Sequence, residues 1–150
     1  MLRAVLVLGL ALASGAASAA TLTVTVTGIE ARRGGLICAA VWASADDFLE
    51  RDRRAASRCQ PVGGSTSTFE FELPPGRYAA LALHDENSDH ELERFLGIPS
   101  EEYAFMNDCD PGLLPPDFED VAVTLGEDSA ATAPSQGSGC PAATEIRFDY

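Results

Sequence analysis

The sequence predicts an all-β fold, an antiparallel β-sandwich of the immunoglobulin-like or transthyretin-like kind. Apolar and polar residues alternate with period two in several short segments, as half-buried strands require. Gly- and Pro-containing turns separate these segments, and only one connection has helical features. At 150 residues the chain can form one core but not two comfortable domains. We therefore expect a single domain over residues 21–150.

The first 20 residues have the features of a secretory signal peptide. An early charge at Arg3 precedes a short apolar run, and small residues follow, ending in Ala-Ser-Ala-Ala. The run is too short to span a membrane, and no later segment is apolar enough to do so. We expect cleavage near Ala19 or Ala20 and export to the periplasm or the medium.

Alternation predicts strands, in order, at residues 21–29, 36–43, 68–73, 78–83, 121–125 and 145–150. The first alternates threonine with valine and leucine, and the third and fourth are joined by a Pro-Pro-Gly turn. The second follows a Gly-Gly turn and is apolar throughout. The expected core comprises Leu22, Val24, Val26, Leu36, Trp42, Phe69, Phe71, Tyr78, Leu81 and Leu83.

The connection after the second strand has the features of a short helix or turn. Ser44 followed by Asp47 forms a possible capping box. Asp47 and Arg51 lie four apart, as do Glu50 and Arg54, which is the spacing of helix-stabilising ion pairs. We expect this segment to connect strands rather than to contribute to the core.

The charge of the chain argues against two classes of partner. The formal net charge is −13, and there is no lysine. A chain this acidic lacks the basic surface with which proteins bind nucleic acids or anionic membranes. It suits cations, or it keeps the protein soluble. We therefore expect an unknown protein or a small ligand as partner, no nucleic acid and no membrane span.

The four cysteines suggest two disulfides, because export places them in an oxidising compartment. Their spacing is too wide for a paired zinc-knuckle motif. Four cysteines allow three pairings. The pairs Cys38–Cys59 and Cys109–Cys140 would each close a local loop and are favoured on that ground. A catalytic thiol is the alternative, and no motif supports it.

An acidic loop after the fourth strand is the main candidate site. Asp85, Asn87 and Asp89 are spaced two apart, and Glu91 and Glu93 continue the pattern. Alternate oxygen-bearing side chains on a curled loop can converge on one cation. Ca²⁺ takes six to eight oxygens at roughly 2.3–2.6 Å. The first three residues match positions one, three and five of an EF-hand loop, so the sequence predicts calcium binding at residues 85–93.

The match to a calcium loop is incomplete. His90 stands where glycine would make the sharp turn, and Leu96 replaces the bidentate glutamate. A missing oxygen would have to come from Glu101 or Glu102. The alternative is a metal-free acidic turn in which Asp and Asn oxygens accept backbone N–H bonds.

The two histidines offer a second type of chemistry. His84 and His90 are six apart, which is not the spacing of a helical zinc pair. His84 ends a strand, where a structural hydrogen-bonding role is expected, and His90 is expected to face solvent. A hydrolase could pair His84 with Asp85 or Glu101 as acid and base. No nucleophile motif such as G-x-S-x-G accompanies them, so no catalytic residues are assigned.

The stretch from the acidic loop onward resembles a known family. The motifs H-D-x-N-x-D-x-x-L-E and L-G-I-P-x-E-x-Y-x-F-x-N are similar to those of the bacterial family named domain of unknown function 2141. Matching positions are His84, Asp85, Asn87, Asp89, Leu92, Gly97, Pro99, Glu101, Tyr103, Phe105 and Asn107. The chain departs from the family pattern at four positions, where His90, Glu93, Ala104 and Met106 stand in place of glycine, aspartate, glycine and serine. The resemblance implies an exported β-sandwich without an established biochemical role.

Three functional hypotheses follow. The first is a non-catalytic binding module whose loop takes Ca²⁺ or fixes a partner. The second is a small hydrolase or metal-dependent enzyme using His84, Asp85 and Glu101. The third is a structural envelope protein with a self-supporting loop, in which the pair Tyr103 and Phe105 anchors the loop to the sheet. The lack of a nucleophile motif favours the first and third.

Overall fold

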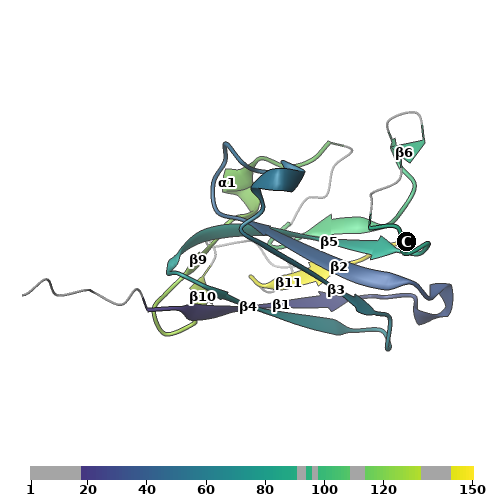
Figure 1. Cartoon of the computed structure of the whole chain (residues 1–150), viewed down its shortest axis with the longest axis horizontal. Coiled ribbons are helices and arrows are strands. Elements are labelled where there is room, and N and C mark those ends of the chain that lie inside the picture. Colours follow the sequence, from purple (N-terminus) through teal and green to yellow (C-terminus); the bar gives the residue numbers. More distant parts are fainter. Residues whose placement is uncertain (1–17, 91–93, 96–97, 109–113, 133–142) are drawn as a thin grey trace, which may run out of the picture.

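The computed structural model describes residues 18–90, 94–95, 98–108, 114–132 and 143–150. It has the predicted all-β, sandwich-like architecture, with two main sheets facing each other (Figure 1). One sheet has the strand order β11-β1-β4, and the other has the order β10-β9-β5-β2-β3, with β8 also pairing with β5. Most of the predicted signal peptide, residues 1–17, lies outside the described residues.

The smaller sheet is built around β1 (Ala20–Thr27). Its antiparallel partner is β4 (Ser67–Leu73), in a register that runs from Ala20 opposite Leu73 to Val26 opposite Ser67. The apolar residues of β1 are buried and its threonines face outward, as the alternation predicts. The other neighbour, β11 (Glu145–Arg147), is parallel to β1, an exception in sheets that are otherwise antiparallel among the described residues.

The larger sheet is organised around β5 (Gly76–Asp85). Antiparallel to it on one side is β2 (Leu36–Trp42), which in turn pairs with the edge strand β3 (Ala56–Pro61). On its other side two short strands pair with different parts of β5, β9 (Val123–Leu125) near its start and β8 (Tyr103–Phe105) nearer its end. β10 (Ala131–Thr132) pairs with β9, and β6 (Arg94–Phe95) pairs with β7 (Ile98–Pro99) apart from the main sheets.

The main core fills the space between the sheets. All the predicted core residues are buried except Leu36 and Leu81, which are half-buried. In β2 the inward face carries Ile37, Ala39 and Val41 instead of Leu36 and Trp42, and in β5 it carries Tyr78, Ala80 and Ala82 instead of Leu81 and Leu83. An apolar run shows no alternation from which the inward face could be chosen, which explains the error.

A second apolar cluster covers the outer face of β5. It contains Phe105, Phe118 and Val121, and half-buried Leu81 packs against it. Phe118 and Val121 belong to α1 (Phe118–Val121), which lies over this sheet (Figure 1). The predicted strand at 121–125 therefore begins later, at Val123, because the residues before it form this helical turn.

The connection after β2 is a turn followed by a 3-10 helix at Arg51–Arg53, and not an α-helix. The expected capping contacts of Ser44 are present, since its Oγ accepts the Asp47 N–H at 3.3 Å and bonds the Asp47 carboxylate at 2.9 Å. Leu49 then adopts a φ of 66°, a left-handed conformation that a continuing α-helix excludes.

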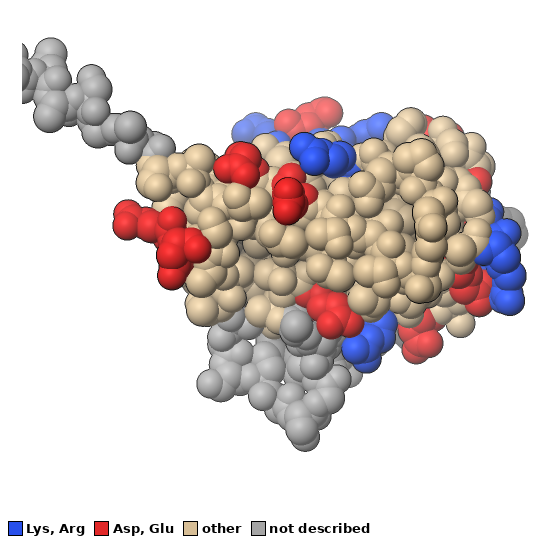
Figure 2. Space-filling view, turned by 90° about the horizontal axis from the view of Figure 1, so that it is seen from below, with Lys and Arg blue, Asp and Glu red and all other residues tan. Residues whose placement is uncertain are grey.

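No helix within the described ranges is both long enough and apolar enough to cross a membrane. The face of the molecule on the side of β1 and β4 is largely uncharged at its centre, with acidic and arginine side chains scattered around it (Figure 2). The net charge of −13 is therefore not gathered into one acidic patch on this face.

Candidate functional site at the end of β5

His84 and Asp85 are the last two residues of β5, so this strand runs two residues past its predicted end at Leu83. They stand opposite Ile37 and Leu36 of β2, and the His84 N–H donates to the Glu102 carbonyl at 2.8 Å. Pairing on both sides keeps this end of the strand extended. Both side chains have no solvent-exposed surface.

The His84 ring is bonded through both nitrogens. Nε2 lies 2.8 Å from the Gly34 carbonyl oxygen, and Nδ1 contacts the Tyr150 hydroxyl. A carbonyl only accepts, so Nε2 carries the proton, and in the neutral ring Nδ1 accepts the phenolic O–H. The ring also stacks on Phe148, with centroids 6.3 Å apart. His84 thus joins β2, β5 and the C-terminal segment, in agreement with the structural role expected for it.

Arg33 packs over Tyr150, whose hydroxyl contacts the His84 ring. Its guanidinium carbon lies 4.5 Å from the centroid of the Tyr150 ring. It also bonds Glu30 at 2.6 Å and Glu86 at 2.8 Å. The hydrogen bond from Arg33 holds the pKa of Glu30 below its ordinary value, and partial burial raises the pKa of Tyr150. The surroundings therefore favour ionised Glu30 and neutral Tyr150.

The carboxylate of Asp85 ties the following turn together. Its Oδ1 accepts the Asp89 N–H at 3.1 Å, and its Oδ2 accepts the His90 N–H at 2.8 Å. Asn87 accepts the same Asp89 N–H through Oδ1 at 3.1 Å and donates to Asp89 Oδ2 at 2.8 Å. These bonds are the Asx-type contacts expected of a self-supporting acidic turn.

A glycine makes the close approach at this end of the sheet possible. Gly35 has a φ of 74°, and a Cβ atom there would lie 2.3 Å from the Asp85 carbonyl oxygen. Both the conformation and the contact with fixed backbone exclude a side chain. Gly35 therefore lets the chain turn tightly into β2 against the end of β5.

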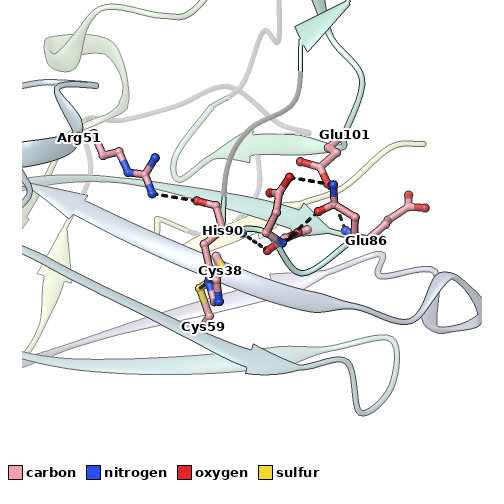
Figure 3. The surroundings of a disulfide bond; sticks show 9 residues. Cys38, Arg51, Cys59, Glu86, His90 and Glu101 are labelled. Carbon is pink, nitrogen blue, oxygen red and sulfur yellow. Dashed lines mark hydrogen bonds between the residues drawn. A yellow bond between two sulfur atoms is a disulfide. The ribbon is translucent and has the colours of Figure 1, made fainter.

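Three of the predicted calcium ligands, Asp85, Asn87 and Asp89, belong to the turn at the end of β5, where the Asp89 N–H is shared by the side chains of Asp85 and Asn87 and the Asn87 amide donates to the Asp89 carboxylate. Glu91 and Glu93 lie outside the residues whose side chains are described. Glu101 accepts the Glu86 N–H at 3.2 Å, beside the turn (Figure 3). Glu102 Oε1 instead accepts the Asp149 N–H at 3.1 Å, so this oxygen bonds the C-terminal segment.

The structure also has a disulfide between Cys38 of β2 and Cys59 of β3, one of the two pairs that the sequence favoured. Cys109 and Cys140 lie outside the described residues. His90 is exposed, as expected, but its Nδ1 lies 3.4 Å from Cys59 Sγ (Figure 3). Sequence reasoning missed this contact, because β3 is a polar edge strand without alternation.

The family's sequence profile, described as an uncharacterized protein conserved in bacteria (DUF2141), matches residues 24–133. The chain belongs to this family. The resemblance inferred from the acidic-loop motifs is confirmed, and the match extends from β1 to β10. No curated protein and no solved structure matches the chain.

Proposed function

We propose that the protein is an exported, non-catalytic β-sandwich module with a binding or structural role. The observation that carries the proposal is the state of His84 and Asp85. Both are fully buried, and both ring nitrogens and both carboxylate oxygens make hydrogen bonds within the fold. Groups used in this way hold the end of β5, the turn and the C-terminal segment together.

The same observation weighs against the alternative hydrolase. A general acid or base must come within hydrogen-bonding reach of the substrate. His84 and Asp85 are 0% exposed and Glu101 is 8% exposed, and Glu101 accepts a backbone N–H. Their use in catalysis would require the end of β5 to open and several buried hydrogen bonds to break.

Calcium binding is a second candidate function of the turn. It is supported by the presence of Asp85, Asn87 and Asp89 in one hydrogen-bonded turn, in which the last two are exposed. Each carboxylate oxygen has two lone pairs, so an oxygen that accepts one N–H bond can still ligate a cation. Glu91 and Glu93 would add oxygens to reach the coordination number of calcium.

The substitution His84→Gln tests the non-catalytic role. Glutamine keeps a hydrogen-bond donor and acceptor but does not transfer protons near neutral pH. Mature wild-type protein should not hydrolyse ester, peptide, glycoside or phosphate substrates above the buffer rate, and the variant should differ from it only in stability. Hydrolysis by wild type that His84→Gln abolishes, in a variant that remains folded by circular dichroism, would show an enzyme.

A further inference from the structure

We propose that reduction of the Cys38–Cys59 disulfide creates a binding site for one cuprous ion, held by the two thiolates and the His90 imidazole. One ligand atom from each of these residues lies within 4.8 Å of the other two. In the part of the chain that the structure describes, no other three Cys, His, Asp or Glu side chains are gathered in this way. The site adjoins the proposed calcium loop, to which His90 belongs, but it uses none of the proposed calcium ligands to hold its ion.

The two sulfur atoms would stay together after reduction. Cys38 and Cys59 stand directly opposite each other in the antiparallel β2–β3 pair, with Cα atoms 4.0 Å apart. The register runs from Leu36 opposite Pro61 to Val41 opposite Ala56. Backbone pairing along the whole of β3 therefore holds the two side chains side by side, with or without the covalent bond.

The third ligand is positioned by bonds to its backbone. The His90 N–H donates to the buried Asp85 carboxylate at 2.8 Å, and its carbonyl oxygen accepts Arg51 Nη2 at 3.3 Å (Figure 3). Its φ is 62°, a left-handed conformation that costs energy for a residue other than glycine. These anchors hold the imidazole over the disulfide, with Nδ1 at 3.4 Å from Cys59 Sγ.

The site is open to solvent on the side of Cys59 and His90. Both residues are exposed, and Cys38 is half-buried. Exposed disulfides are more easily reduced than buried structural ones, because a thiolate can approach a sulfur atom. A reductant and then a metal ion can therefore reach this pair without unfolding the sandwich.

The chemistry balances with a dithiol as reductant. One of its thiolates attacks a sulfur of the disulfide, and its second thiol resolves the mixed disulfide. The S–S bond of the protein breaks, the dithiol becomes a disulfide, and the two cysteines receive two electrons and two protons. Metal binding then displaces both thiol protons to solvent.

The ligand set favours Cu(I) over other metals. Thiolates are soft ligands that select Cu(I) and Zn²⁺, and imidazole suits both. Structural zinc sites are almost always four-coordinate, whereas cuprous ion is stable with three ligands. The described residues supply two sulfurs and one nitrogen, which is a complete set for Cu(I).

The test is a competition titration with Cu(I) held by the coloured chelator bicinchoninate. The full mature chain is reduced with a phosphine and freed of it by gel filtration without oxygen. The substitutions Cys109→Ser and Cys140→Ser together make the reference protein, in which only the proposed pair of thiols remains. Reduced reference protein should remove one Cu(I) per chain from the chelator, and the oxidised form should remove none.

The variant His90→Asn tests the third ligand, because asparagine tolerates a positive φ but lacks the imidazole. Loss of this ligand should weaken Cu(I) binding by at least on the order of tenfold, the effect of losing even an outer-shell partner. Circular dichroism and the melting temperature of the variant should match those of the reference.

Three results would overturn the proposal. They are equal affinity in His90→Asn, Cu(I) binding by the oxidised reference protein, and tighter binding of Zn²⁺ than of Cu(I) by the reduced form. Because the reference protein serves as its own control through oxidation, the test does not require variants that replace Cys38 or Cys59.

Discussion

The two histidines flank the same turn and have opposite environments. His84 is fully buried, and both of its ring nitrogens are bonded within the fold. His90 is exposed, and only its backbone is anchored by the turn, while its ring lies beside a disulfide. Asp85 connects them, since it adjoins His84 and bonds the His90 N–H. The comparison shows that the turn separates a buried histidine with a structural role from an exposed histidine whose ring solutes can reach.

The substitution His84→Ala should cause the largest loss of folding stability. The change removes a buried ring and leaves the Gly34 carbonyl and the Tyr150 hydroxyl without their partner. Truncating a large, fully buried side chain to alanine typically costs about 2–5 kcal/mol, whereas the half-buried Gly34 carbonyl and the exposed Tyr150 hydroxyl can bond water instead, so we expect a loss of about 4 kcal/mol in the free energy of unfolding. Urea denaturation measures it. His90→Asn is the matched control, because asparagine tolerates the φ of 62° at this position, and it should cost within about 0.5 kcal/mol; equal losses would remove the contrast between the two histidines.

Loss of the Cys38–Cys59 bond should cause the next largest loss of folding stability. The cysteines are 21 residues apart in sequence. For a loop of this size, the chain-entropy relation gives a stabilisation of about 3 kcal/mol. The double substitution Cys38→Ala/Cys59→Ala should show this loss when it is compared with wild type by urea denaturation under non-reducing conditions. Its circular dichroism spectrum should match that of wild type. An unfolded double variant would show that strand pairing alone does not hold β3.

Calcium should stabilise the fold through the turn. At free calcium about a hundred times the Kd, linkage gives roughly 2.7 kcal/mol, or a melting shift of several degrees. Magnesium should do less, because it requires tighter octahedral geometry. Asp89→Ala should abolish the shift, whereas Glu86→Ala should keep it, since Glu86 bonds Arg33. No heat in calorimetry with millimolar calcium, together with an unchanged melting temperature, would leave the turn self-supporting and metal-free.

The smallest effect expected is a loss of stability at alkaline pH. Burial raises the pKa of Tyr150 and of Tyr78, so the folded state favours the neutral phenols. Their contribution is fully present below the ordinary tyrosine pKa of about 10 and is lost as the pH rises through the higher folded-state values. Urea denaturation from pH 8 to pH 11 should show this decline. Tyr150→Phe should make it shallower, and an equally steep decline in the variant would assign it to other groups.

The central strands could be predicted from the sequence because their signal is local. Alternation in β1 and β4 reports which side chains face the core, and it is visible in the residues themselves. The Gly-Gly turn before β2 and the Pro-Pro-Gly turn before β5 could be predicted for the same reason, because their residues are neighbours in the sequence. The acidic-loop motifs likewise sufficed to recognise the family whose profile matches residues 24–133.

Pairing between distant segments was decided only by the tertiary structure. β3 has no alternating pattern, because an edge strand with exposed side chains needs none, and its register against β2 brings Cys59 to Cys38. The parallel pairing of β11 with β1 joins segments from opposite ends of the domain sequence, with Thr25 opposite Glu145. Continued pairing with β2 extends β5 through His84 and Asp85 and buries them, although polar residues usually end a strand. The sequence alone determined that a turn rich in oxygen ligands follows a buried strand, but the contact of His90 with a sulfur 31 residues away required the packed sheet.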